Sequence, residues 1–395
     1  MIFLESITAW LSNLSINRGI MLVMMLFMTV GAIDRVRGNR YGYGEKFEEG
    51  FHAIGPLALS IVGVVAATPV IARLLGPAIT PLYERIGADP SMFATTLLAC
   101  DMGGYSLAME LAENPSIGTF AGLILGTMMG PTIVFTIPVA LGILAKKDIP
   151  YLGAGVMIGL ITIPLGCIAG GLSMNLLTDY SIRLDQILLN LVPVMLISVL
   201  LSIGLWCWPE KMVSGFRAFG TGITAAITLL AAIAVFEQIT GILLPLFDVM
   251  ALPDESGLTP LDAGLLTCGQ IGIVLIGAFP MVEWMTRTFG KGLATLGALL
   301  GMNEKACVGL LSSLAHAIAT LSLVKEMDPK GKLLNLAFAV SAASVFGAHL
   351  GFTAGMNQSM VAPVIIGKLT AGIAALLLAN WMAPSLIRRM NEKKS

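Results

Sequence analysis

Long hydrophobic runs, separated by short clusters of charged residues, set the pattern of this sequence. About 20 apolar residues are enough to cross a lipid bilayer as an α-helix. Nine runs qualify, the first of them once the neutral residues before Arg18 are added: Gly19–Ile33, Gly50–Ala72, Asn114–Ala145, Ile149–Thr178, Gln186–Trp208, Ala218–Phe236, Ala263–Val282, Leu333–Gly367 and Leu369–Ile387. The pattern therefore predicts an all-α polytopic membrane protein with about nine transmembrane helices.

Two further segments, Ile86–Met109 and Ala306–Val324, are apolar but interrupted. Each leads to a turn with an Asx-Pro pair, Asn114-Pro115 after the first and Asp328-Pro329 after the second. Such a segment can enter and leave the bilayer from one face as a re-entrant hairpin, or it can span the bilayer outright. We favour two re-entrant hairpins, and the alternative is eleven spans with nearly the same loop charges.

Three long runs contain residues that break a helix. They hold Gly130-Pro131, Pro164 and the polar stretch Met356–Ser359. Proline removes a backbone donor and clashes with the preceding turn. In lipid, the freed carbonyl groups are tolerated only where they face protein or a watery cavity. One kink can serve packing alone, but three broken spans favour a transport pathway.

A weak internal repeat appears when the chain is compared with itself at an offset of 214 residues. Gly87–Asp89 then aligns with Gly301–Asn303, and Asn114-Pro115 aligns with Asp328-Pro329. The first turn is flanked by acidic residues and the second by lysines. Because loops rich in Lys and Arg favour the cytoplasm, we expect the first turn outside and the second inside. The two copies would then form an inverted structural repeat, as in many secondary transporters.

This scheme divides one transmembrane transporter domain, residues 1–395, into parts. We place the first inverted repeat at residues 51–178 and the second at residues 263–387. Residues 179–262 would supply connecting helices and an external loop. Residues 388–395 would form a basic tail, and the charge of the loops predicts a cytoplasmic C-terminus.

Composition supports the membrane assignment and excludes several other classes. Hydrophobic residues make up 56% of the 395 residues and charged residues only 12%, about half the share in a soluble globular protein. The net charge of −1 gives no basic excess for binding nucleic acid. None of the five cysteines forms a CxxC pair, and no HExxH, GxSxG or Walker-type motif occurs. We therefore expect no metal site, no cofactor and no enzyme, with an intramembrane enzyme as a remote alternative.

Asp101 is the most informative single residue. It lies in an apolar segment, and the nearest other charge along the chain is Glu110. An Asp at the centre of a membrane helix costs roughly 2.5–3.5 kcal/mol, so such a residue is normally paired, protonated or solvated in a cavity. Gly103-Gly104 follows at once and suits a tight hairpin tip or a close approach of the backbone to a ligand. Asp101 is thus a candidate counter-ion for a cationic substrate or a coupling proton, unless it pairs structurally with a distant donor.

Other polar residues at membrane depth are weaker candidates, since each also has a purely structural interpretation. Tyr105 could place its ring beside a bound ammonium group, or anchor the chain at the interface. Uncharged candidates for contacts with a substrate, or between helices, are Thr132, Asn357 and Gln358. Candidates for a proton or polar relay are His316, His349 and Glu49.

Several longer stretches resemble one family. They are Phe47–Phe51, Pro90–Phe93, Leu98–Gly104, Met128–Phe135, Ile163–Gly171, Pro209–Met212 and His349–Phe352. In this order they resemble the ethanolamine permease family of bacterial ethanolamine-utilisation operons, the EutH type, over nearly the whole chain. The chain departs from the family pattern at Ala348, where the family has Asp, and at His316-Ala317, where it has paired Asn.

The resemblance implies uptake of ethanolamine across the bacterial cytoplasmic (inner) membrane. An alkylamine with a pKa near ~10.4 is almost entirely cationic at pH 7, so a carrier must receive a cation. In this hypothesis Asp101 holds the ammonium group, Tyr105 and Phe135 contact it, and Thr132, Asn357 and Gln358 face the hydroxyl group. The alternative is an ion-coupled carrier of the same architecture for another small amine or a nucleoside-like solute. The sequence leaves open whether H⁺ or Na⁺ is coupled and whether the protein forms a homo-oligomer.

Overall fold

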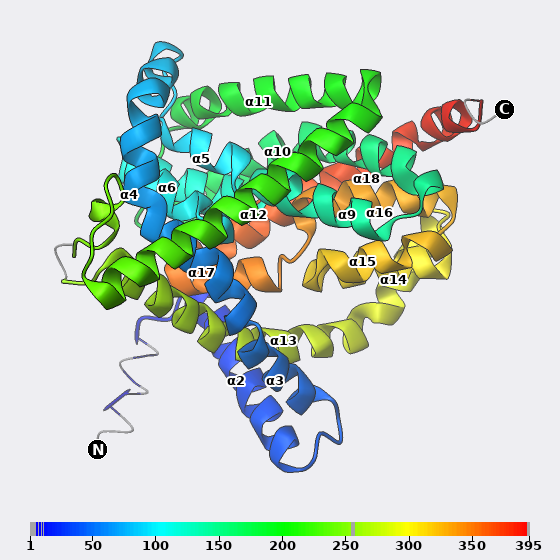
Figure 1. The fold of residues 1–395 in the computed structure, drawn as a ribbon. Coiled ribbons are helices and arrows are strands. Elements are labelled where there is room, and N and C mark those ends of the chain that lie inside the picture. The colour runs from blue at the N-terminus through cyan, green and yellow to red at the C-terminus, as the bar shows by residue number, and fades with distance from the viewer. Residues whose placement is uncertain (1–4, 7, 9, 11, 254–256, 393–395) are drawn as a thin grey trace.

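The computed structural model describes residues 5, 6, 8, 10, 12–253 and 257–392, and this part of the chain is helical with no strand. Eight helical segments of the described part are long and apolar enough to cross a membrane. Figure 1 shows that most of them run side by side, with shorter helices between them. The prediction of an all-α polytopic membrane protein is confirmed.

Seventeen α-helices are described. They are α2 (Ile16–Val36), α3 (Tyr43–His52), α4 (Ile54–Arg85), α5 (Ser91–Leu97), α6 (Gly104–Leu111), α7 (Pro115–Thr119), α8 (Met129–Pro131), α9 (Ile137–Ile143), α10 (Ile149–Leu177), α11 (Leu184–Cys207), α12 (Pro209–Thr240), α13 (Pro260–Leu299), α14 (Glu304–Ala315), α15 (Ala317–Leu323), α16 (Pro329–Ala342), α17 (Ala348–Met356) and α18 (Val361–Glu392). Short 3₁₀ or π turns join some of them: η1 (Cys100–Met102), η2 (Phe120–Ile124), η3 (Leu125–Thr127), η4 (Thr132–Thr136), η5 (Lys146–Asp148), η6 (Asp248–Met250), η7 (Val324–Glu326) and η8 (Gln358–Met360).

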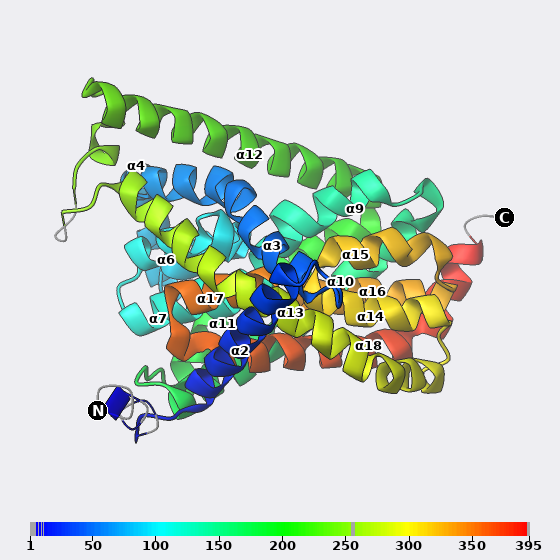
Figure 2. The same cartoon turned by 90° about the horizontal axis from the view of Figure 1, so that it is seen from below.

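Both interrupted segments fold as helical hairpins. In the first, α5 and α6 pack together, and the backbone N–H of Asn114 donates to the Asp89 carboxylate at 3.1 Å. In the second, α14 and α15 pack together, and the N–H of Asn303 donates to Asp328 at 2.9 Å. The two ends of each hairpin are therefore held close together by this hydrogen bond. The two lie toward opposite ends of the molecule in both ribbon views (Figures 1 and 2), and their re-entrant placement in a bilayer stays a prediction.

Two predicted span boundaries are wrong. The run Leu333–Gly367 is not one span, because the chain leaves the helix after α16 and starts again with α17, and Ser344 between them has a left-handed φ of 58°. The break predicted at Lys368 does not occur either, since α18 begins at Val361 and continues through Lys368. Of the predicted tail, residues 388–392 belong to α18, and residues 393–395 lie outside the described residues.

The core lies where α10, α16 and α18 pack against one another. Gly166 on α10 approaches the backbone of Gly367 on α18 so closely that a side chain at Gly166 would clash there. The helices can come this near because their contact is lined by small residues. On the outer helices large apolar side chains are exposed, for example Leu196 and Leu200 on α11, as expected of a surface that faces lipid.

Candidate functional site

A cavity of about 470 Å³ lies beside the breaks of both hairpins. Its walls come from α3, α4, η1 and η4 in the first half of the chain and from α13, α15, α16 and α17 in the second half. Its polar and charged wall residues are Glu49, His52, Ser60, Asp101, Thr136, His316, Ser344 and His349. Since a water molecule takes up about 30 Å³ in the liquid, a small solute and several waters fit here.

Asp101 reaches this cavity because the first hairpin breaks at its tip. The helix α5 ends at Leu97, the next residue Leu98 is extended, and Gly103 takes a left-handed φ of 84° before α6 begins. Gly103 packs against Val64 and Gly130 packs against the backbone of Leu98, so neither position has room for a side chain. Asp101, half-buried at this tip, accepts no side-chain hydrogen bond from the described residues. Its carboxylate is therefore available to a cation in the cavity.

His316 lies at the break of the second hairpin. Its imidazole Nδ1 accepts a hydrogen bond from the backbone N–H of Ile318 at 3.2 Å and so caps α15. Its ring also meets the ring of Phe135 edge-on, with the centroids 6.3 Å apart. Next to this tip, the N–H of Ser344 donates to the carbonyl of Ser313 at 2.8 Å. This hydrogen bond joins the second hairpin to the break between α16 and α17, and residues from both line the cavity.

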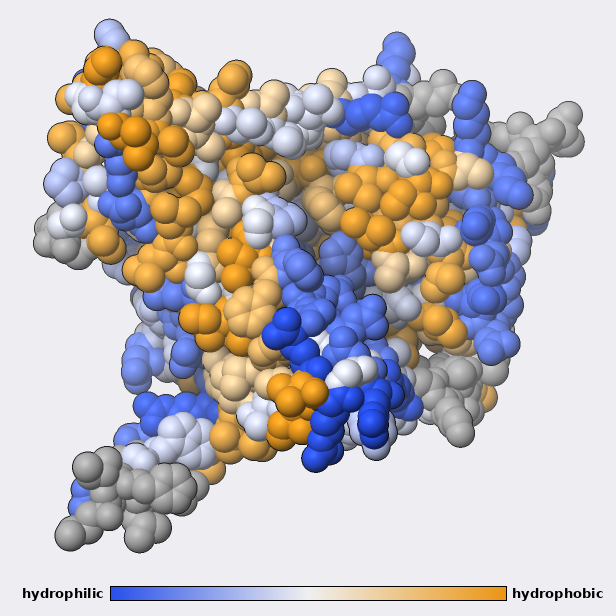
Figure 3. All heavy atoms as spheres, turned by 60° about the horizontal axis from the view of Figure 1, so that its bottom comes forward, coloured by the Kyte–Doolittle hydropathy of each residue, from blue (hydrophilic) through white to orange (hydrophobic). Residues whose placement is uncertain are grey.

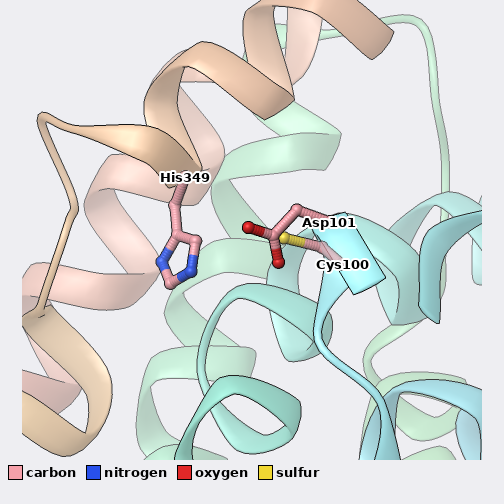
Figure 4. Close-up of side chains that lie close together, drawn as sticks. All are labelled: Cys100, Asp101 and His349. Carbon is pink, nitrogen blue, oxygen red and sulfur yellow. The ribbon is translucent and has the colours of Figure 1, made fainter. Parts of the chain in front are cut away.

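Lys368 is a functional candidate that the sequence analysis missed. Its side chain is 1% exposed, and its Nζ lies 2.6 Å from the carbonyl oxygen of Thr127 and 3.1 Å from Nδ1 of His349. His349, Cys100 and Asp101 bring their side-chain N, S and O atoms within 4.8 Å of one another. Figure 4 shows these three side chains close together. Asp101 and Lys368 attract each other electrostatically. A buried lysine and a carboxyl group therefore lie close together, and Asp101 of the two lines the cavity.

A signal for Lys368 was present in the sequence. It is the one charged residue between Lys332 and Arg388. An isolated charge within so long an apolar stretch is a functional candidate by default, by the same argument that selected Asp101. The predicted spans end at Gly367 and resume at Leu369, so they place Lys368 in a loop between them.

The predicted site residues divide into two groups. Asp101, Phe135, His316, His349 and Glu49 line the cavity, the last of them near its exposed edge and paired with Lys46 at 2.6 Å. The remaining four, Tyr105, Thr132, Asn357 and Gln358, are not among its wall residues. Asp101 therefore shares the cavity with the three relay candidates. The uncharged candidates Thr132, Asn357 and Gln358 do not line it.

Each residue outside the cavity wall has other surroundings. The ring of Tyr105 meets that of Phe352 edge-on, with the centroids 6.0 Å apart. The Thr132 hydroxyl lies 2.8 Å from the carbonyl oxygen of Met128 and 3.0 Å from that of Val340. The Asn357 side chain donates to the hydroxyl of Tyr180 at 2.8 Å, and Gln358 is exposed. These contacts suit helix packing in this conformation.

In Figure 3 a hydrophilic strip runs from the middle of the view to its lower edge, on the face of the molecule that carries α2 and α3. Largely hydrophobic surface lies on both sides of it. The cavity residues Glu49 and His52 belong to α3 and are exposed, as is His316. Polar side chains at the rim favour water over lipid in the cavity mouth.

The comparisons with known proteins decide the family. The family model described as "Ethanolamine utilisation protein, EutH" matches residues 16–382. The chain belongs to the EutH family. A relative from Listeria monocytogenes, "Probable ethanolamine permease EutH", is 47% identical over 381 residues, which cover 96% of this chain and 98% of the relative.

Two further relatives are nearly as similar. The Escherichia coli protein, also "Probable ethanolamine permease EutH", is 44% identical over 396 residues and covers 94% of this chain and 96% of its own length. "Uncharacterized protein YxeR" of Bacillus subtilis is 46% identical over 383 residues, with 97% and 99% covered. No solved structure matches the chain. The names of the Listeria and E. coli relatives describe transport and not catalysis, in agreement with the prediction that this chain is not an enzyme.

Proposed function

We propose that this EutH protein imports ethanolamine, as the ethanolammonium cation, across the bacterial cytoplasmic membrane. The observation that carries the proposal is the Asp101 carboxylate on the wall of a cavity enclosed by apolar helices. A carboxylate in such surroundings favours a cation, and Phe135 on the same wall offers a ring to the ammonium group. The names of the relatives supply the substrate that fits this chemistry.

The hydroxyl end of the substrate requires polar partners that also face the cavity. Ser60, Thr136 and Ser344 line it and carry hydroxyl groups that can donate and accept. We therefore assign the recognition of the alcohol to these three in the conformation described. Thr132, Asn357 and Gln358 stay predictions for a conformation in which the broken spans have moved.

The transport cycle in this proposal is alternating access between two inverted repeats. The element bounds support the repeat: at the offset of 214 residues α10 falls on 363–391, which lies within α18, and the hairpin anchors Asp89 and Asn114 fall on Asn303 and Asp328. The repeats of many carriers rock against each other around a central site. With the first hairpin turn outside and the second inside, each tip would close the cavity toward one face.

The test is uptake of labelled ethanolamine by proteoliposomes, with the wild type beside Asp101→Asn. We expect kcat/KM to fall by a factor of about 10 to 100 in Asp101→Asn, because a hydrogen bond to a charged group is worth ~1.5–3 kcal/mol. Measurements at external pH ~5.5 and ~8 bracket the ordinary pKa of histidine, about 6.5, and show whether the relay candidates matter.

A control variant and competing solutes distinguish the possible results of this uptake experiment. Asp185→Asn removes a carboxylate that is exposed and paired with Arg183, and uptake should be unchanged. Uptake that persists in Asp101→Asn would remove Asp101 from the site but leave the carrier. Competition by choline, propanolamine and uridine tests the substrate class, and wild-type vesicles that take up uridine but not ethanolamine would favour a nucleoside-like solute.

A further inference from the structure

We infer that Lys368 is a resident cation of the substrate site, and that an alkylammonium substrate binds to Asp101 in exchange for one proton released from Lys368. This inference rests on the proposed function and deepens it. It assigns a role to a residue that does not line the cavity. It also predicts the net charge that crosses the membrane in one transport cycle.

The first argument is the position of the Lys368 ammonium group. It is 1% exposed and has two direct contacts, the Thr127 carbonyl oxygen at 2.6 Å and Nδ1 of His349 at 3.1 Å. Neither contact is a carboxylate, and among the described residues Asp101 is the acid that interacts with Lys368. A buried charge without a balancing partner is strongly unfavourable. In this inference the site holds one cation and one anion before substrate binds.

The second argument is the number of charges once substrate has bound. An ethanolammonium group at Asp101 would place two cations beside one buried carboxylate. The other groups facing Lys368 do not balance this excess: they are the Cys100 thiol and the His349 imidazole. Two long helices pack along α18: α10 carries Tyr151 and Cys167 as titratable residues, and α16 carries Lys330 and Lys332, the second of which pairs with Asp148. Loss of the Lys368 proton restores neutrality without a change in the fold.

The third argument is a route for the proton. Lys368 is absent from the cavity wall, but His349, 3.1 Å away, lines it. Nδ1 of His349 can accept from the Lys368 ammonium group when the other ring nitrogen carries the hydrogen. The proton passes from Lys368 to His349 and then to water in the cavity. Farther along the wall lie His316 and Glu49, which can take it toward the rim.

The charge balance of the cycle follows. On the outer side one ethanolammonium enters and one proton leaves, and on the inner side one ethanolammonium leaves and one proton returns to Lys368. Each turnover moves one cation inward and one proton outward, so transport is electroneutral. Uptake should then respond to a pH gradient and not to the membrane potential.

The experiment measures protons released on binding. Ethanolamine hydrochloride is titrated into purified wild-type protein in nanodiscs, by calorimetry in two buffers that differ in ionisation enthalpy. We expect about one proton released per ethanolammonium bound, and a dissociation constant that rises about tenfold for each pH unit lowered while Lys368 stays protonated. Binding without proton release would overturn the inference and leave the proposed function standing. No binding at any pH would overturn both.

Variants identify the source of the proton. Lys368→Met should bind ethanolammonium with no proton release and a flat pH dependence, and its uptake in proteoliposomes should become sensitive to the membrane potential. The control Lys325→Met removes an exposed lysine and should behave as the wild type. If Lys368→Met still releases a proton, the proton comes from another group such as Asp101 or His349, and the inference is wrong.

Lys368→Arg is the second variant, because arginine keeps its charge at every accessible pH. It should lower the affinity for ethanolammonium by at least tenfold, while a folded wild-type elution profile in gel filtration is retained. Unchanged affinity in a folded Lys368→Arg protein would contradict the exchange of charge. If neither variant folds, a wild-type count of zero protons still overturns the inference.

Discussion

At the scale of single residues, Thr132 and Thr136 begin and end one π-helical turn, η4, yet their hydroxyls lie in different surroundings. Thr132 lies in hydrogen-bonding distance of two backbone carbonyls, whereas Thr136 lines the cavity. A π-helical turn changes the angular spacing of side chains compared with an α-helix, and it often occurs at functional sites. The two threonines therefore offer a matched pair for separating packing from recognition.

We expect Thr136→Val to raise the KM for ethanolamine uptake about three- to tenfold, because a neutral hydrogen bond is worth ~0.5–1.5 kcal/mol. Thr132→Val should leave KM unchanged and lower the melting temperature of the purified protein. Uptake kinetics and thermal unfolding of both variants provide the measurement. The reverse result would return Thr132 to the substrate site, as the sequence predicted.

At the scale of elements, the two hairpins share one anchoring scheme. Asp89 accepts from the N–H groups of Ser91 at 2.9 Å and Asn114 at 3.1 Å. Asp328 accepts from the N–H groups of Asn303 at 2.9 Å and Gly331 at 3.2 Å. Each aspartate accepts from a backbone donor at both ends of its hairpin, so it ties the two ends together.

Asp89→Ala and Asp328→Ala should each destabilise the protein by about 1–3 kcal/mol, since backbone donors lose their partners. Thermal unfolding in detergent measures this loss. Asp185→Ala is the control, because an exposed ion pair contributes little. If either variant at an anchor melts like this control, its hairpin is held by packing alone.

At the scale of the whole molecule, a buried ion pair joins the two halves of the chain. Lys332 at the start of α16 lies 2.5 Å from Asp148 in η5, and their side chains are 10% and 1% exposed. The Lys332 ammonium group also lies 5.8 Å from the centroid of the Tyr151 ring. Removing one partner of a buried pair leaves an uncompensated charge.

Lys332→Met should therefore destabilise the protein by about 3–5 kcal/mol, and the double variant Lys332→Met/Asp148→Asn should cost less than the sum of the single changes. A double-mutant cycle on thermal unfolding measures the coupling. Additive effects would mean that the pair does not link the halves energetically. Uptake by the double variant then shows whether this link must open during transport.

The sequence by itself determined the membrane class, most spans and the choice of Asp101 and the histidines. A long apolar run is more stable across a membrane than exposed to water. An isolated charge in such a run costs enough free energy to mark it as a functional candidate. The Asx-Pro turns also marked both hairpins, because Asn114 and Asp328 act as N-caps with proline at the first helical position.

Tertiary structure alone decided which of these residues meet. The offset of 214 residues hints at a repeat, but the distance between Lys368 and His349 depends on how α17 and α18 fold against each other. Likewise, the Thr132 hydroxyl could not be assigned to Val340 from the sequence, since 208 residues separate the two. Hydrophobic patterns report burial, a property of each segment, whereas a site depends on contacts between segments that only packing brings together.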